Sequence, residues 1–320
     1  MKRTTLIILL LAAFLIVNCS PQWTDGSVIA TETNNGIVFI APRGSRPPIQ
    51  KIIWSPSDEN NLLILANETP IIPSEIYVLD IRTQEKKFLI EPLRNAQFVD
   101  VEWMPDGEKI LLLVYDTTGF EPSGWWSIDV NNKSVERLLD PFDEVAWSPD
   151  GSKIVALRRI QPNDPTRLEL HLIDSYTNVE ESIALYENVD FGSGISWSPD
   201  NQYVVFSVSQ HGDSNLFILD LKTRRISQIT QGFDSVRPRW SPRGNVIAFE
   251  RKSPDKIGTY LHLISSDGKC MIEIPNLDRA WSPTWSPDGK RIAFLSGGGI
   301  YVLETDVVLG RDIYKNLCPK

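Results

Sequence analysis

The chain has 320 residues, of which 42% are hydrophobic, enough to bury a substantial core. It is acidic, with 32 Lys and Arg residues against 41 Asp and Glu residues. A nucleic-acid partner is excluded by this charge and by the lack of any Lys/Arg run, because phosphate contacts need clustered basic residues.

The N-terminus predicts a secretory signal segment. Lys2 and Arg3 precede an apolar run from Leu6 to Val17, which is too short to span a bilayer. A positive start followed by a short apolar stretch is typical of a cleaved signal. We therefore expect a signal peptide over residues 1–18.

The end of that run resembles a bacterial lipobox, in which a cysteine is lipidated and becomes the mature N-terminus. The cysteine is Cys19, and Asn18 departs from the small residue usual before it. We expect lipid attachment at Cys19 and a short membrane tether over residues 19–25. The alternative is an ordinary cleaved signal with an incidental cysteine.

One motif dominates the rest of the chain. Trp-Ser-Pro, usually followed by Asp-Gly, occurs six times at intervals of 43 to 50 residues, with Met replacing Ser in the second copy. A fixed period of this length is typical of a repeat architecture. The six copies start at Trp54, Trp103, Trp147, Trp197, Trp240 and Trp285.

Each repeat predicts one small antiparallel sheet. An apolar alternation leads into the Trp, and Ser, Pro and Gly then take the places that they favour in a type I turn. Second strands are expected at residues 153–157, 203–208, 246–250 and 291–295. Third strands are expected at residues 75–80, 124–129, 168–174, 215–220, 259–265 and 299–304. With a fourth, outer strand in each repeat, the fold class is all-β: a six-bladed β-propeller of four-stranded antiparallel blades.

The two ends of the chain are expected to close the ring together. Residues 36–41 precede Trp54 at the spacing that a fourth strand has before Trp103, whereas the last repeat has only a weak fourth strand. An open propeller would leave a bare sheet edge. The propeller is expected over residues 26–313, with a C-terminal tail at 314–320. Seven blades, the extra one built from both termini, is the alternative.

The turn followed by Lys-Ile-x-Ala or Arg-Ile-Ala-Phe resembles the WD-like repeat of TolB-type propellers. The resemblance covers nearly all of the chain after the signal segment and implies a propeller fold. TolB also carries an α/β domain before its propeller; we expect none here, so its role in the Tol-Pal system is not carried over. Similar repeats form the gating propeller of prolyl oligopeptidase-like peptidases, whose hydrolase domain is not expected here either.

The innermost strands supply the candidate binding residues. The residue two places before each Trp is apolar, so strand alternation turns the residues one and three places before it toward the axial channel. These positions hold Lys51, Asp100, Glu102, Glu144, Arg237 and Arg239, with small Gly194, Ser196, Ser282 and Thr284 between them. Such a channel could bind a small polar ligand or a peptide terminus; a water-filled channel of structural salt bridges is the alternative.

Catalytic motifs are lacking in the sequence. His171 and His262 stand where other repeats place an aromatic residue in the third strand, so they are expected to pack, and His211 is expected in an exposed loop. There is no Gly-x-Ser-x-Gly elbow, Cys/His metal spacing, phosphate loop or calcium loop. We therefore expect no metal and no cofactor.

Two cysteines remain if Cys19 carries lipid. Cys270 precedes an outer strand of the fifth repeat and Cys318 lies in the tail, in a compartment where disulfides can form. A disulfide between them would pin the tail across a blade edge. Two free thiols are the alternative.

Together these patterns predict a monomeric, non-catalytic lipoprotein of the bacterial cell envelope, on the periplasmic side or the cell surface. A protein or peptide partner is expected to bind the propeller face built by loops of variable length, opposite the uniform Pro-Asp-Gly turns. The alternative is a hydrolase or lyase acting on envelope or extracellular polysaccharide. For that activity, Asp100, Glu102 and Glu144 form the cluster to test.

Overall fold

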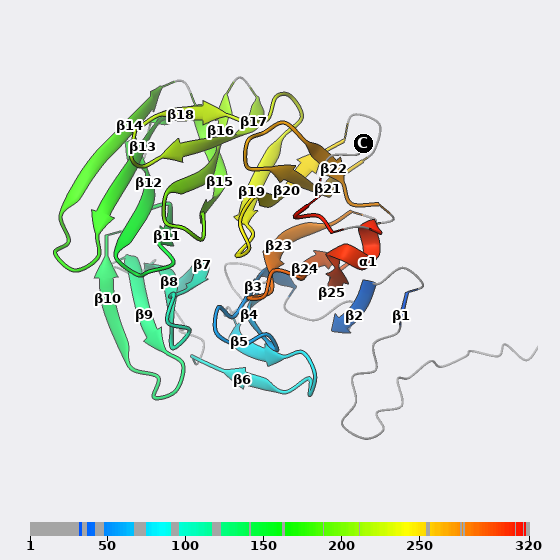
Figure 1. Cartoon of the computed structure of the whole chain (residues 1–320). Coiled ribbons are helices and arrows are strands. Elements are labelled where there is room, and N and C mark those ends of the chain that lie inside the picture. The colour runs from blue at the N-terminus through cyan, green and yellow to red at the C-terminus, as the bar shows by residue number, and fades with distance from the viewer. Residues whose placement is uncertain are drawn as a thin grey trace, which may run out of the picture.

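The computed structural model of the chain describes most of the repeat region. The ranges are 32–33, 37–41, 48–66, 75–90, 96–116, 123–140, 142–161, 164–187, 189–210, 212–253, 257–275, 277, 279–310, 312–315 and 317. The expected signal peptide, Cys19 and its tether, His211 and Cys318 lie outside these ranges. Within them the strands form six sheets arranged around a common centre (Figure 1). The six-bladed propeller is thus confirmed.

Each blade presents one strand to the central axis. These inner strands are β3 (Ile49–Trp54), β7 (Ala96–Trp103), β11 (Glu144–Trp147), β15 (Val189–Trp197), β19 (Ser235–Trp240) and β23 (Trp281–Trp285). The second strands are β4 (Asn61–Ala66), β8 (Lys109–Asp116), β12 (Lys153–Gln161), β16 (Tyr203–Gln210), β20 (Val246–Lys252) and β24 (Arg291–Ser296).

The outer half of each blade completes an antiparallel meander. The third strands are β5 (Glu75–Asp80), β9 (Gly124–Asp129), β13 (Asp164–Asp174), β17 (Asp213–Asp220), β21 (Thr259–Ser265) and β25 (Gly299–Glu304). The outer strands of the first five blades are β6 (Lys86–Phe88), β10 (Val135–Leu139), β14 (Glu180–Glu187), β18 (Ile226–Gln228) and β22 (Met271–Glu273).

The last blade is closed by the N-terminal part of the chain, as expected. β2 (Ile37–Ala41) pairs antiparallel with β25, with Ile37 opposite Leu303, and the two lie side by side in Figure 1. A further short strand, β1 (Glu32–Thr33), pairs with β2, so this sheet has five strands instead of four. The seven-bladed alternative is wrong because both N-terminal strands join the sixth sheet.

The Trp-Ser-Pro-Asp-Gly motif has a local explanation. In the third blade, the Ser148 hydroxyl donates to the Asp150 carboxylate at 2.7 Å and accepts from the backbone N–H of Lys153 at 2.9 Å. Gly151 has φ of 75°, a left-handed conformation that glycine adopts without a side-chain clash. The motif therefore fixes the tight turn between the inner and second strands.

The motif tryptophans also connect neighbouring blades. In three blades the indole Nε1–H donates to a backbone carbonyl of the preceding inner strand: Trp103 to Ile53 at 3.3 Å, Trp197 to Ala146 at 2.9 Å and Trp285 to Arg239 at 2.9 Å. In the described part of the chain, the buried indole N–H groups of Trp54 and Trp240 find no partner.

The chain after β25 packs back on the propeller. A single helical turn, α1 (Thr305–Leu309), was not expected from the sequence. Beyond it, the Tyr314 hydroxyl donates to the carbonyl of Gly289. Leu317 is buried in the hydrophobic core between the fifth and sixth blades.

Cys270 packs against the same core and is disulfide-bonded. The other two cysteines of the chain lie outside the described residues. None of the described helical residues forms a helix with the length and apolarity needed to cross a membrane.

We predict that the indole hydrogen bond between blades contributes measurably to stability. Trp197→Phe should lower the free energy of unfolding by about 1 kcal/mol more than Trp240→Phe, because only Trp197 loses a hydrogen bond and leaves a carbonyl unpaired. Both side chains are buried to a similar degree, at 6% and 8% exposure. Urea unfolding of the two variants measures the difference, and equal losses would contradict it.

Candidate functional site

The predicted channel residues converge on one cavity. Its volume is about 260 Å³, and its lining includes all six charged residues singled out in the sequence: Lys51, Asp100, Glu102, Glu144, Arg237 and Arg239. They come from four inner strands, at residues that precede the motif Trp. The lining extends to Gln50, Val99, Asp143 and Ser193, four places before the motif Trp, and includes no residue of the motif turns, so the cavity lies on the side of the channel away from those turns.

A bulge in the inner strands shapes this end of the channel. The residue three places before the motif Trp is Gly194, Arg237 or Ser282 in the last three blades, with φ of 106°, 50° and 56°. The pairing register of each of these strands shifts at the same place. Since left-handed backbone is strained for residues with a side chain, Arg237 and Ser282 are held there by the surrounding structure.

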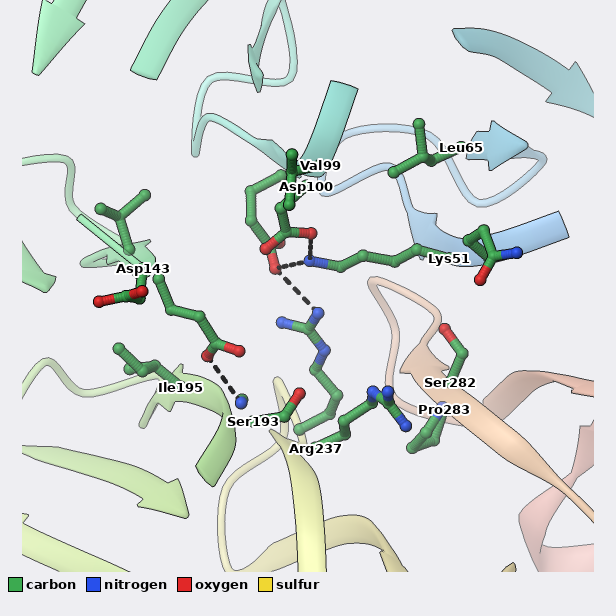
Figure 2. Close-up of a pocket in the computed structure, with 16 residues that line it drawn as sticks. Lys51, Leu65, Val99, Asp100, Asp143, Ser193, Ile195, Arg237, Ser282 and Pro283 are labelled. Carbon is green, nitrogen blue, oxygen red and sulfur yellow. Dashed lines mark hydrogen bonds and ion pairs between the residues drawn. The ribbon is translucent and has the colours of Figure 1, made fainter. Parts of the chain in front are cut away.

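Four of the charged side chains form one partly buried network (Figure 2). The Lys51 ammonium donates to Asp100 at 2.6 Å and to Glu102 at 2.8 Å, and Arg239 donates to the same oxygen of Glu102 at 2.8 Å. Burial alone would lower the pKa of Lys51, but the two carboxylates outweigh it and raise that pKa. Burial would raise the pKa of Glu102, but Arg239 and Lys51 lower it. Lys51 and Glu102 therefore stay charged.

Glu144 lies beside this network without a cation of its own. Its Oε2 accepts the backbone N–H of Gly194 at 2.6 Å, and among the described residues it forms no ion pair. Because the carboxyl group lies deep in the protein and faces Asp100, its pKa rises to about 7, although Lys51, the Gly194 N–H and Arg239 act in the opposite direction. Glu144 thus changes its charge near neutral pH.

Arg237 pairs with a residue that the sequence analysis missed. Its Nη1 donates to Oε2 of Glu250 at 2.9 Å, and Oε1 of Glu250 accepts the backbone N–H of Ser282 at 2.6 Å. Glu250 is 1% exposed, and burial raises its pKa despite Arg237. The only signal for Glu250 was a carboxylate at the end of the apolar second strand Val-Ile-Ala-Phe-Glu.

The small channel residues cap the edge of the next blade. The Thr284 hydroxyl accepts the backbone N–H of Trp54 at 2.9 Å, and Ser196 accepts that of Trp240 at 2.9 Å. Ser282 accepts the N–H of Ile52 at 3.3 Å. These N–H groups point away from their own sheets, so the hydroxyls supply partners that the inner strands lack. This role was not foreseen.

The described histidines lie elsewhere. His171 and His262 are buried in third strands, where their rings contact Phe142 and Phe249, as the packing interpretation predicts. Among the residues that the structure describes, no group of three or more His, Cys, Asp or Glu side chains is arranged to hold a metal ion.

Comparison with known proteins identifies related chains. Residues 130–305 match the family described as the TolB beta propeller domain. The Tol-Pal system protein TolB of Francisella tularensis subsp. mediasiatica (strain FSC147) is 24% identical over 160 residues, 49% of this chain and 35% of that protein. The match therefore spans about a third of the length of that relative.

Solved structures share the fold at low sequence identity. TolB from Acinetobacter baumannii superposes with a TM-score of 0.60 at 14% identity, covering 83% of this chain and 66% of that one. Oligogalacturonate lyase from Vibrio parahaemolyticus superposes with a TM-score of 0.55 at 11% identity, covering 87% of this chain and 96% of that one. At these identities the likeness shows the fold alone.

We predict that Glu144 makes stability depend on pH. Its pKa rises from 4.5 to about 7 on folding, so the native state binds more protons than the unfolded state between these values. Stability therefore falls as the pH rises through this window, by about 3 kcal/mol at most. Glu144→Gln keeps an acceptor for the Gly194 N–H and should lack this loss.

The measurement is urea unfolding at several pH values. The advantage of Glu144→Gln over the wild type should grow from about pH 4.5 to about pH 7 and then level off. Glu187→Gln is the control, since it removes the same charge from the exposed outer strand of the same blade. Parallel profiles for wild type and Glu144→Gln would refute the assignment.

Proposed function

Because the chain belongs to the TolB beta propeller domain family, we propose that it is a non-catalytic binding protein of the bacterial cell envelope. In this proposal the propeller face that carries the channel pocket recognises a protein or peptide partner. The name of the Francisella relative, a Tol-Pal system protein, supports the envelope setting.

One observation carries the proposal: the charges of the pocket are engaged with one another. Lys51 is bonded to Asp100 and Glu102, and Arg239 shares Glu102. Such a network gives a rigid floor with fixed donors and acceptors, which suits recognition. A pair of carboxylates acting as acid and base would instead need both groups available to a substrate.

The pocket also has a rim suited to a macromolecular partner. Val99 lines the cavity and is 48% exposed, so an apolar side chain is accessible beside the buried charges. Residues near the centre of an interface gain most of the binding energy when the partner covers them fully. A partner that inserts one side chain into the pocket would cover this rim.

Site-specific photocrosslinking tests the proposed binding face. We expect a benzophenone amino acid at Val99, expressed in the native bacterium, to give a discrete crosslinked partner. The same group at Asp200, an exposed residue of the Pro-Asp-Asn turn of the fourth blade on the opposite face, should give none. Equal crosslinking from both positions, or none from Val99, would argue against the proposal.

The enzymatic alternative has its own readout. Cleavage of oligogalacturonate or an envelope polysaccharide by the purified protein would replace the binding proposal, provided that the activity is lost in both Glu102→Gln and Glu144→Gln. Retention of activity in both variants would place the reaction outside the channel pocket.

We also propose that Cys19 carries the lipid that holds the propeller at the membrane, on the periplasmic side or the cell surface. Cys19→Ser should move the protein from the membrane fraction to the soluble fraction. Mass spectrometry of the N-terminal peptide should show a lipid on the wild type and none on the variant. An unmodified Cys19 in the wild type would end the anchoring proposal.

A further inference from the structure

We propose that the channel pocket receives a primary ammonium group on an apolar stem, such as a lysine side chain or a peptide N-terminus, with Glu144 as its counter-ion. This inference rests on the proposed function and deepens it. It names the chemical group by which a protein or peptide partner enters the pocket.

The first argument is the balance of charge. Three cations border the pocket, and each already has a carboxylate: Lys51 has Asp100 and Glu102, Arg239 shares Glu102, and Arg237 has Glu250. Three cations thus meet three carboxylates before Glu144 is counted. Ionised Glu144 therefore gives the pocket one negative charge in excess.

The remaining carboxylate in the lining, Asp143, does not alter this balance. Asp143 accepts hydrogen bonds from the Arg159 guanidinium at Oδ1 and from the backbone N–H of Arg159 at Oδ2, both at 2.7 Å. Its charge is therefore compensated by Arg159. The excess charge of the pocket is that of Glu144 alone.

The second argument is the orientation of the Glu144 carboxylate. Its Oε2 is held by the Gly194 N–H at 2.6 Å, whereas its Oε1 has no hydrogen-bond partner among the described residues. Gly194 adds no side chain beside it, and a Cβ there would lie 2.6 Å from the Cα of Arg237. The close approach of Arg237 thus requires glycine here, and this packing holds the Gly194 N–H in place against Oε2 of Glu144.

The third argument is an apolar side chain at the cavity. Val99 lines the cavity beside the charged groups and is 48% exposed. Alkyl ammonium groups bury their methylene stem along apolar surface and keep the charged end at a polar partner. An exposed apolar side chain combined with one uncompensated carboxylate therefore fits such a group better than a sugar or a free anion.

Binding should be linked to the proton of Glu144. The groups facing Glu144 are Asp100 from β7, Lys51 from β3 and Arg239 from β19, and they remain in their own ion pairs. At a pH below about 7 the carboxyl group is largely protonated. An arriving ammonium stabilises the carboxylate, so one proton passes from Glu144 to the buffer as the ion pair forms.

Isothermal titration calorimetry of the full chain in neutral detergent tests the inference. The probes are Nα-acetyl-lysinamide and glycinamide, which carry an amine, and Nα,Nε-diacetyl-lysinamide, which does not. We expect at least one amine to bind and the diacetylated probe not to bind. The tighter amine identifies a lysine side chain or an N-terminus as the source. With Nα-acetyl-lysinamide, whose amine is protonated at both pH values, about one proton should be released at about pH 6 and almost none at about pH 8, measured in two buffers of different ionisation enthalpy.

Matched variants separate this inference from the proposed function. Glu144→Gln should weaken amine binding about 30-fold or more, since it removes the charge from a buried ion pair, while thermal unfolding confirms that the variant is folded. Glu187→Gln should leave amine binding unchanged. Failure of both amines to bind, equal binding of the diacetylated probe, or full binding by Glu144→Gln overturns the ammonium site. If the ammonium site is overturned in this way but Val99 still crosslinks to a partner, the proposed binding face stands and only the ammonium inference fails.

Discussion

The propeller depends on hydrogen bonds between the inner edge of each blade and the blade beside it. An inner strand has a sheet partner on one side only, so half of its backbone N–H groups need acceptors from outside the sheet. The adjacent blade supplies them here, through the hydroxyls of Ser196, Ser282 and Thr284 and the carboxylate of Glu144. The motif indoles of Trp103, Trp197 and Trp285 add hydrogen bonds in the same direction, because each donates to a carbonyl of the preceding inner strand.

This way of sealing the ring also produces the pocket. The residues that reach the neighbouring blade occupy the positions one and three places before the motif Trp, which are the positions that face the channel. Where they are small, they cap the next strand; where they are charged, as Lys51 and Asp100 are, they pair across the channel. Glu144 is charged but caps the next strand, since one oxygen accepts the Gly194 N–H and the other remains available to the cavity. The chemistry of the pocket therefore follows from the closure of the ring.

The sequence predicted the fold well because turn chemistry marks every blade. β5, β9, β21 and β25 begin and end at the predicted residues, and β2 closes the ring as expected. The short elements β1 and α1 carry no periodic pattern and could not be predicted. Strand alternation correctly predicted that the six charged residues face the same channel, but it could not predict which of them form ion pairs. The contacts of Glu250 with Arg237 and Ser282 lie at bulges, where left-handed backbone occurs at residues other than glycine and leaves no trace in the sequence. The partner Glu250 escaped notice because it lies on a second strand.

Amide hydrogen exchange, followed residue by residue by NMR, tests the sealing of the blade edges most directly. The N–H groups of Trp54, Trp240 and Gly194 face away from their own sheets and bond to side chains of the adjacent blade. If these contacts hold the ring together, the three amides exchange as slowly as those paired inside the sheets, only when the propeller opens as a whole. Exchange at the rate of unstructured amides, while the sheet amides stay protected, would show that the inner edges are not sealed by their neighbours.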